Sequence, residues 1–396
     1  MLKPLQNCVQ RKLLLNIQNR LQQMPVVAIL GPRQVGKTTL AKLIVNDYPN
    51  AQFLDLERNQ DRQILQQPDL YFPSHRDQLV VIDEVQFSPQ IFRALRPEID
   101  QYRKSGRFLL LGSASGALLQ QSSETLAGRI SFQELTPFLI NEVTPINHQN
   151  SLQKLWLKGG YPGSFLENDD AIAHMWRMDF IKSLLQRDLP NYGVRISSTT
   201  LEKYWQMLAH LQGQIFNASD LSRSLGMSSP KTAESYLNTL IDAMMVRRLP
   251  PYFVNIGKRL VKAPKIYIRD SGILHTLLNI VNLKDLQGNP IVGASWEGFV
   301  IEQIANNLPL GAQLFYYRTQ AGSEIDLVIE KGLKRIAVEI KLSSSPTVKR
   351  GFWQALDDIS ATSSYVIAPV NQTYQLREET FVMSPLDFIN QVLNNI

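Results

Sequence analysis

The fold of the first part of the chain is decided by the stretch Gly31-Pro32-Arg33-Gln34-Val35-Gly36-Lys37-Thr38, with Thr39 directly after it. It fits the pattern G-x-x-x-x-G-K-[ST]. An apolar run, VVAIL at 26–30, precedes it, and a helical pattern at 39–45 follows. Because glycines let the backbone curl and a helix start presents free N–H groups, the stretch predicts a phosphate-binding turn between a strand and a helix.

The residue types in this turn predict ATP and Mg²⁺ as cofactors. The backbone from Gly31 to Thr39 would surround the phosphates, and Lys37 would reach the β- and γ-phosphates. The Thr38 hydroxyl would be a ligand of Mg²⁺.

A second acidic element follows another apolar run, LVVIDE at 79–84. Asp83 would hold Mg²⁺, and Glu84 would polarise the attacking water. The alternative is a surface pair that merely ends a strand. Beside the phosphate-binding turn, the pair predicts ATP hydrolysis in addition to binding.

Two further candidates complete this site. Ser113 ends the run FLLLGS at 108–113, and ligands gather at the carboxyl ends of strands in open α/β sheets. Arg129 would stabilise transition-state charge as an arginine finger, or would sense the nucleotide. A plain surface arginine is the alternative reading of Arg129.

The chain as a whole reads as a folded protein of several domains. Its 396 residues exceed one typical domain, and 44% of them are hydrophobic. Strand candidates alternate with helical patterns at 26–30, 53–56, 79–83 and 108–113. This rhythm predicts an α/β fold with a parallel sheet covered by helices.

The pattern changes twice further along. It becomes helical from about residue 150, and after about 265 a helix at 295–308 precedes three strand candidates. We predict three domains: an ATPase core at 1–148, a helical lid and winged-helix region at 149–265, and a separate α/β domain at 266–396.

Residues 218–241 carry a helix-turn-helix pattern. A short helix at 218–225 is followed by a Gly226 turn, and Pro230 suits the first turn of a second helix. The second helix turns an apolar stripe inward and leaves Lys231 outward, where it would meet a DNA groove. Helix pairs of this kind also occur in ordinary bundles.

The next segment, 247–269, contains seven Lys or Arg and no acidic residue. Around a turn at Gly257 it predicts a β-hairpin wing that contacts phosphates. With Lys231, the DNA-binding candidates are Arg247, Arg248, Lys258, Arg259 and Lys262. A solvated hairpin, or a contact to an acidic protein, remains the alternative.

Two alternating runs in the last region gather carboxylates. Residues 324–329 place Asp326 on the same strand face as a second acid, and 335–341 place Glu339 and Lys341 together. Pairing these strands would form a second Mg²⁺ site at Asp326 and Glu339, with Lys341 and Glu297 beside it. An amphipathic hairpin with a polar face is the alternative.

Nearly the whole chain resembles prokaryotic AAA+ ATPases of the AAA_14 type found with a DUF4143 domain. The shared segments are GPRQVGKTT at 31–39, IDEVQ at 82–86, GSAS at 112–115 and LAGR at 126–129, with LTPF, RDLP, PYFVN and SEIDLVIE downstream. The resemblance implies an ATPase that assembles as a homo-oligomeric ring, with an arginine acting across the subunit boundary.

The carboxylate runs resemble the PD-(D/E)XK nuclease superfamily. Asp326 matches the first acid, Glu339-Ile340-Lys341 matches E-x-K, and Gln354 is a possible helix-borne accessory. The resemblance implies a restriction-endonuclease-like fold. It leaves cleavage and binding without turnover equally open.

Composition limits the setting in which the protein works. Cys8 is the sole cysteine, which excludes an intrachain disulfide and a cysteine zinc site, and no run approaches 18 apolar residues. We expect a cytoplasmic protein without a membrane span.

Three functions fit these features. The leading hypothesis is an ATPase that remodels or translocates duplex or branched DNA. The alternatives are a nucleotide-dependent switch acting on a protein partner, and an ATP-gated, metal-dependent nuclease.

Overall fold

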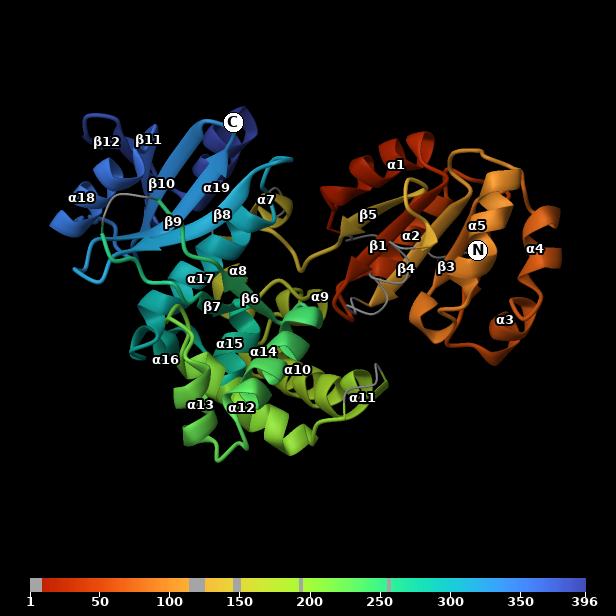
Figure 1. The fold of residues 1–396 in the computed structure, drawn as a ribbon, viewed down its shortest axis with the longest axis horizontal. Coiled ribbons are helices and arrows are strands. Elements are labelled where there is room, and N and C mark those ends of the chain that lie inside the picture. Colours follow the sequence, from red (N-terminus) through yellow and green to blue (C-terminus); the bar gives the residue numbers. More distant parts are fainter. Residues whose placement is uncertain (1–8, 114–124, 145–150, 192–194, 255–257) are drawn as a thin grey trace. The chain divides into compact units, whose positions relative to one another are not determined.

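The computed structural model describes residues 9–113, 125–144, 151–191, 195–254 and 258–396. The chain divides into two compact units (Figure 1). The first unit contains Met1–Phe138 with Asp242–Met244, and the second contains Leu139–Ile241 with Met245–Ile396. The first break thus follows Phe138, whereas we predicted it after residue 148.

A five-stranded parallel sheet forms the centre of the first unit, in the order β2-β3-β4-β1-β5. Its strands are β1 Val26–Gly31, β2 Gln52–Asp55, β3 Val80–Asp83, β4 Phe108–Ser113 and β5 Ile130–Glu134. The predicted parallel α/β sheet is confirmed. Strands β1, β3 and β4 are buried on both faces, which explains why their sequences are continuous apolar runs.

Helices cover both faces of this sheet. Alternate residues of β1 point to opposite sides: Ala28 packs in the core with Phe92 and Leu95, and Ile29 packs with Ile17 and Ile44. The helices of this unit are α1 Leu13–Gln23, α2 Lys37–Val45, α3 Asn59–Ile64, α4 Pro68–Ser74 and α5 Ile91–Gln101, with a 3₁₀ turn at Val85–Phe87.

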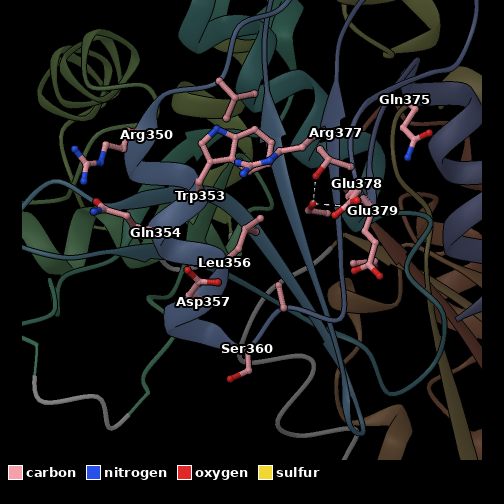
Figure 2. Close-up of a pocket in the computed structure, with 15 residues that line it drawn as sticks. Arg350, Trp353, Gln354, Leu356, Asp357, Ser360, Gln375, Arg377, Glu378 and Glu379 are labelled. Carbon is pink, nitrogen blue, oxygen red and sulfur yellow. Dashed lines mark hydrogen bonds between the residues drawn. The ribbon is translucent and has the colours of Figure 1, made fainter.

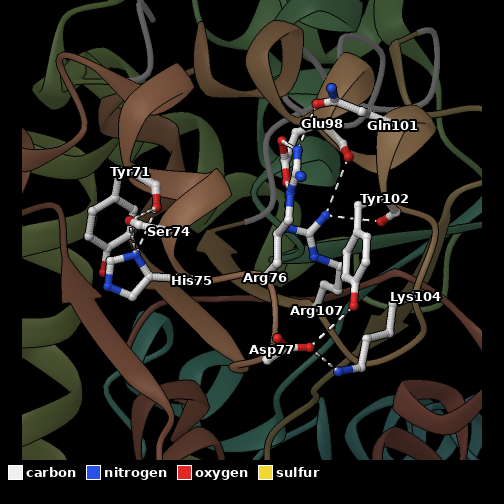
Figure 3. Close-up of polar contacts among 10 residues, drawn as sticks. All are labelled: Tyr71, Ser74, His75, Arg76, Asp77, Glu98, Gln101, Tyr102, Lys104 and Arg107. Carbon is white, nitrogen blue, oxygen red and sulfur yellow. Dashed lines mark hydrogen bonds and ion pairs between the residues drawn. The ribbon is translucent and has the colours of Figure 1, made fainter.

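A buried ion network fastens α5 to the start of β4 (Figure 3). Glu98 accepts hydrogen bonds from Arg76 at 2.9 Å and from Arg107 at 2.8 Å, and Arg107 is only 2% exposed. Burial opposes the charge on Glu98, but the two arginines outweigh it and lower the pKa of this carboxyl.

The second unit begins with a helical part. Its helices are α7 Ile140–Val143, α8 Ser151–Lys158, α9 Pro162–Phe165, α10 Asp170–Ser183, α11 Leu189–Asn191, α12 Ser198–His210, α13 Ala218–Ser224, α14 Pro230–Asp242, α15 Ser271–Leu277, α16 Leu283–Gln287 and α17 Val292–Ala305. A π-helical turn, Leu184–Asp188, follows α10. All five tryptophans of the chain belong to this unit, at positions 156, 176, 205, 296 and 353.

A buried histidine ties three of these helices together. His275 of α15 is fully buried and bonds the Leu157 carbonyl of α8 at 2.9 Å and the Ser295 hydroxyl of α17 at 2.7 Å. Trp156 also donates to Ser295, at 3.0 Å, and packs edge-on against Trp296. Burial lowers the pKa of His275 to about 4, so the folded protein holds the neutral imidazole.

The predicted helix pair of the helix-turn-helix pattern is present as α13 and α14, and Pro230 is the first residue of α14. Two strands follow, β6 Val246–Leu249 and β7 Lys265–Ile268, paired antiparallel. Since β7 begins at Lys265, it crosses our predicted boundary after residue 265, and both sides of that boundary belong to one unit.

The segment between β6 and β7 differs from a free wing. Its described parts pair with the edge of β8: Tyr252 donates its N–H to the Tyr316 carbonyl at 2.6 Å, and Val261 donates to Arg318 at 3.0 Å. The edge strand satisfies backbone groups that a projecting hairpin would leave to water. The predicted turn at Gly257 lies outside the described residues.

A six-stranded mixed sheet closes the chain, in the order β12-β13-β11-β10-β9-β8. Its strands are β8 Gln313–Arg318, β9 Glu324–Lys331, β10 Lys334–Ile340, β11 Ser363–Ile367, β12 Tyr374–Arg377 and β13 Thr380–Met383. Helix α18, Arg350–Ile359, packs Phe352 and Ala355 against Val328 and Ala337. The end of the chain is α19 Pro385–Asp387, a π-helical turn at Phe388–Val392 and a 3₁₀ turn at Leu393–Asn395.

Removing the acid of the buried network should destabilise the first unit. Glu98→Gln leaves Arg107 buried without its counter-charge, and breaking such a pair costs about 3 kcal/mol. Urea unfolding followed by far-UV circular dichroism at pH 7 measures this loss. Asp77→Asn, at the exposed partner of Lys104, is the matched control and should change stability little. Equal stability of Glu98→Gln and wild type would contradict the assignment.

The buried His275 should make the second unit acid-sensitive. Its pKa rises from about 4 when folded to about 6.5 when unfolded, so its stabilisation is present above pH 6.5 and is lost as the pH falls toward 4. Relative to His275→Gln, which does not titrate, wild type should lose about 3 kcal/mol between pH 7 and pH 4. Urea unfolding at each pH provides the measurement, with His210→Gln as the exposed-histidine control. A constant difference across this range would refute the neutral assignment.

Candidate functional site

The carboxyl ends of three strands meet at one edge of the first sheet. Strands β1 and β4 pair in parallel with Gly31 opposite Ser113, and β3 pairs with β4 one position further along the sheet. Strand β3 ends at Asp83. This edge therefore brings together the predicted loop, the acidic pair and Ser113, at the position where α/β sheets bind ligands.

The loop after β1 has the backbone conformation of a phosphate cradle. Gln34 and Gly36 both have positive φ, at 61° and 100°. A Cβ on Gly31 would lie 2.2 Å from the Leu135 carbonyl oxygen, so a side chain cannot fit at this position. Helix α2 then begins at Lys37, with its first N–H groups facing the loop.

Arg11 braces this loop from outside. Its guanidinium donates to the Val35 carbonyl at 3.1 Å and to the Thr136 carbonyl, and it lies over the Phe138 ring at 5.1 Å. Arg11 is 7% exposed. Our sequence analysis missed this contact because Arg11 lies 24 residues before Val35 and no motif marks it.

Lys37 and Thr38 occupy the inside of the cradle. The Lys37 ammonium donates to the carbonyls of Gly31 at 3.0 Å and Pro32 at 2.9 Å. The Thr38 hydroxyl donates to the Asp83 carboxylate at 2.6 Å. The two residues predicted to hold Mg²⁺ are therefore in direct contact, although 45 positions separate them in the chain.

Asp83 is buried and Glu84 is half-buried. Burial is the main cause that raises the pKa of Asp83, with the Thr38 and Glu84 hydrogen bonds opposing it. Glu84 has a positive φ of 55° and a pKa that is raised, chiefly by burial. A carboxylate with a raised pKa is a better proton acceptor, which suits a catalytic base.

Gln86 is a site residue that our sequence analysis quoted without assigning it a role. Its amide nitrogen donates to the Glu84 carboxylate, and its amide oxygen accepts the Ser113 backbone N–H at 3.3 Å. Gln86 thus links Glu84 to the end of β4. The Ser113 hydroxyl is buried and has no hydrogen-bond partner among the described residues. The rest of the predicted GSAS segment, Ala114 and Ser115, lies outside them.

Arg33 and Arg129 are both in ion pairs within the first unit. Arg129 directly precedes β5, which begins opposite the start of β1, so Arg129 lies at the other edge of the sheet from the phosphate-binding loop. Arg129 forms two hydrogen bonds with Asp100 of α5, at 2.6 and 2.9 Å. Arg33 of the loop pairs with Glu57 at 2.9 Å. The finger role of Arg129 stays a prediction, and it requires Arg129 to leave Asp100.

The donor set at this edge fits Mg²⁺ bound with a nucleotide. Thr38 supplies a hydroxyl oxygen and Asp83 a carboxylate oxygen, both on rigid elements. Mg²⁺ prefers one or two such protein oxygens and takes its other ligands from phosphates and water.

Three of the six predicted DNA-binding residues, Arg247, Arg248 and Lys258, are held in ion pairs within the second unit. Arg247 and Arg269 both bind Glu302 of α17, Arg248 binds Glu234, and Lys258 binds Asp358. Burial opposes ionisation of Glu302, but Arg247 and Arg269 lower its pKa to about 2. By contrast, an exposed set of cations shows no ion pair to any residue in the described ranges: Lys231, Arg259 and Lys262.

The predicted carboxylate cluster does assemble in the second unit. Asp326 of β9 accepts the Ile340 N–H of β10 at 2.9 Å, and Lys341 donates to Glu339 at 2.5 Å. Burial, and then the charge of Asp326, raise the pKa of Glu339 to about 8 and also raise the pKa of Glu297. Because the charge of Asp326 acts on both carboxyls, Glu297 of α17 lies beside β9 and β10.

Two members of this cluster, Lys265 and Tyr267, were not assigned to it from the sequence. Lys265 of β7 lies 2.9 Å from Glu324 and 3.4 Å from Glu297, and the Tyr267 hydroxyl donates to Glu297 at 2.6 Å. Alternation along 265–268 puts Lys265 and Tyr267 on one face, which was the available signal. The described residues contain no group of three or more His, Cys, Asp or Glu side chains arranged to hold a metal.

Gln354, the possible accessory, lines a separate hollow beside α18 (Figure 2). The hollow has a volume of about 1260 Å³. Arg377 lies over the Trp353 ring at 4.8 Å, and Arg350 and Glu379 bring both signs of charge to its lining. None of its lining residues belongs to the carboxylate cluster.

Within the ranges that the structure describes, every helix is too short or too polar to cross a membrane.

Glu84 should be essential for turnover. Glu84→Gln removes the proton acceptor while keeping the side-chain shape, so we expect kcat for ATP hydrolysis to fall by roughly 10²-fold or more with KM nearly unchanged. Steady-state phosphate release over a range of Mg-ATP concentrations measures both quantities. Glu57→Gln, the same change on an exposed carboxylate beside the loop, should retain most activity. Glu84→Gln at half the wild-type rate would exclude Glu84 as the base.

Family models match three consecutive parts of the chain. An AAA domain matches residues 23–144, a domain of unknown function (DUF8612) matches 149–284, and a domain of unknown function (DUF4143) matches 292–389.

The solved structures to which the chain is similar share less of its sequence. The Walker-type ATPase paby2304 of Pyrococcus abyssi has a TM-score of 0.48 at 16% identity, covering 68% of this chain and 96% of that one. The RuvB Holliday junction branch migration motor of Thermotoga maritima has a TM-score of 0.29 at 18% identity, covering 59% and 89%.

Two curated proteins are similar along almost the entire chain. They are the uncharacterized proteins Rv2008c of Mycobacterium tuberculosis and Mb2031c of Mycobacterium bovis. Each is 41% identical over 373 residues, which cover 94% of this chain and 82% of the relative. The chain therefore belongs to the family of these two mycobacterial proteins, and it is an ATPase in which an AAA domain precedes DUF8612 and DUF4143 domains.

Proposed function

We propose that ATP hydrolysis in the first unit drives remodelling or translocation of DNA bound by the second unit. The observation that best supports ATP hydrolysis is the 2.6 Å hydrogen bond from the Thr38 hydroxyl to the Asp83 carboxylate. It joins the phosphate-binding loop to the acidic strand end. The DNA part is supported by the exposed cations of the second unit.

The residues of the site divide the chemistry among them. When the triphosphate binds, the Lys37 ammonium exchanges the Gly31 and Pro32 carbonyls for phosphate oxygens. Bound Mg²⁺ would neutralise phosphate charge, held by Thr38 and Asp83.

Glu84 accepts the proton of the attacking water at its carboxylate. Gln86 holds that carboxylate and the Ser113 N–H in one hydrogen-bonded chain. The position of Glu84 is therefore sensitive to movement at the end of β4, where the γ-phosphate would lie.

The exposed cations of the second unit support binding to phosphates of duplex or branched DNA. Lys231 and Ser235 are exposed on α14, and Arg259 and Lys262 are exposed in the connection between β6 and β7. Such contacts position a protein on DNA and weaken as salt rises.

We also propose that the protein assembles as a homo-oligomeric ring in the cytoplasm. In this ring, Arg129 of one subunit would act on the ATP site of its neighbour.

A nucleotide-dependent switch on a protein partner is the second candidate, favoured by an apolar stripe on α10. Ile172, Met175 and Met178 recur every three residues and are 49%, 54% and 52% exposed. Exposed apolar stripes of this kind mark protein contacts, and methionine adapts to varied partners.

DNA should stimulate hydrolysis through the exposed cations. We expect single-stranded, duplex or four-way-junction DNA to raise kcat several-fold at low salt. The variant Lys231→Gln/Arg259→Gln/Lys262→Gln should lose this effect while keeping basal turnover, because three phosphate contacts are removed. ATPase assays at two salt concentrations measure this, with Lys37→Ala as the inactive reference.

The matched control is Lys334→Gln, which neutralises an exposed lysine on β10. It should keep the stimulation. If no DNA form stimulates wild type, the DNA proposal fails. If DNA has no effect but Met175→Asp changes kcat for ATP hydrolysis, the protein-partner switch is favoured.

A further inference from the structure

The carboxylate cluster of the second unit already contains a cation in its interior. Lys265 is 3% exposed, and its ammonium lies 2.9 Å from Glu324 and 3.4 Å from Glu297. It also lies 5.5 Å from the centre of the Tyr316 ring, which favours a positive charge there.

The backbone places this ammonium without strain. Lys265 is the first residue of β7, which pairs with β6 along Lys265–Ile268. Tyr267, two residues on, points to the same side and donates its hydroxyl to Glu297 at 2.6 Å. Glu297 thus receives two donors from one strand.

The negative charge of the cluster is partly balanced without a metal. Two lysines, Lys265 and Lys341, face the carboxylates of Glu297, Glu324, Asp326 and Glu339. Burial opposes the charge on Lys265, but the carboxylates, Glu297 foremost, raise its pKa above the ordinary value.

A divalent metal does not fit this arrangement. Mg²⁺ or Mn²⁺ would need several oxygen ligands turned toward one point. Instead, Asp326 accepts the Ile340 N–H, Glu339 binds Lys341, and Glu297 is held by Tyr267 and Lys265. Each carboxylate is directed at a donor of the chain itself.

We propose that the Lys265 ammonium takes the place of a divalent cation in this cluster, so that the site binds a metal only when Lys265 is removed. Buried charges are stable only when paired. Lys265 supplies that pairing from β7 and so joins β7 to α17 and β9. The cluster is then a structural link between elements, and the metal centre expected from the nuclease-like pattern is replaced.

Mn²⁺ binding tests whether the Lys265 ammonium takes the place of a divalent cation. All variants carry Asp83→Asn and are kept nucleotide-free, so that the ATP site does not contribute Mn²⁺ binding. With Lys265 present, calorimetric titration should give the same Mn²⁺ isotherm with and without Asp326→Asn. Lys265→Met should gain one Mn²⁺ site at least ~10-fold tighter than any site in its parent. Adding Asp326→Asn to Lys265→Met should abolish that site.

Thermal unfolding provides a second readout. Mn²⁺ at 1 mM should raise the Tm of Lys265→Met by about 5 °C and leave that of its parent unchanged. Lys265→Arg keeps the charge and should behave as the parent, and Lys262→Met is the matched exposed control.

Asp326-dependent Mn²⁺ binding in the protein with Lys265 intact would overturn the proposal. A folded Lys265→Met that gains no Mn²⁺ site would overturn it as well. If Lys265→Met fails to fold, the comparison of parent and Asp326→Asn still decides, because metal bound through Asp326 is incompatible with Lys265 acting as the cation.

Discussion

The parallel register of β1, β4 and β3 is the constraint on which the nucleotide site depends. It places Gly31 opposite Ser113 and brings β3 to its end at Asp83 on the same sheet edge. The loop after β1 can then turn back only because Gly31 has no side chain where the Leu135 carbonyl approaches. Helix α2 follows at once, so the Thr38 hydroxyl meets Asp83. A shift of one residue in the register would separate these groups.

Buried carboxylates play a comparable role in the second unit. Glu302 of α17 binds one arginine from β6, Arg247, and another just after β7, Arg269. Lys265, at the other end of β7, binds Glu297 one helical turn or so earlier in α17. The short β6–β7 ladder is thereby fixed to α17 at both ends. Five of the seven cations of the basic segment 247–269 are therefore in ion pairs inside the second unit.

The sequence was sufficient to predict the bounds of strands and helices where the residues that determine them are neighbours along the chain. Apolar runs predicted β1, β3 and β4 to within a residue, and Pro230 marked the start of α14. Partners distant in the chain were not predictable. Arg247 and Glu302 are 55 residues apart, and nothing local distinguishes a paired arginine from one that faces a ligand. The same limit applies to Arg11 and to Lys265, whose roles depend on which strands and helices pack together.

The distribution of tryptophan has a spectroscopic consequence. All five tryptophans lie in the second unit, several of them in the helical core around Trp156, Trp176 and Trp296, whereas ATP binds in the first. Tryptophan emission therefore has no reporter inside the nucleotide-binding unit. Any change in tryptophan fluorescence that follows ATP addition, beyond absorption by the nucleotide itself, is a direct optical signal of communication from one unit to the other.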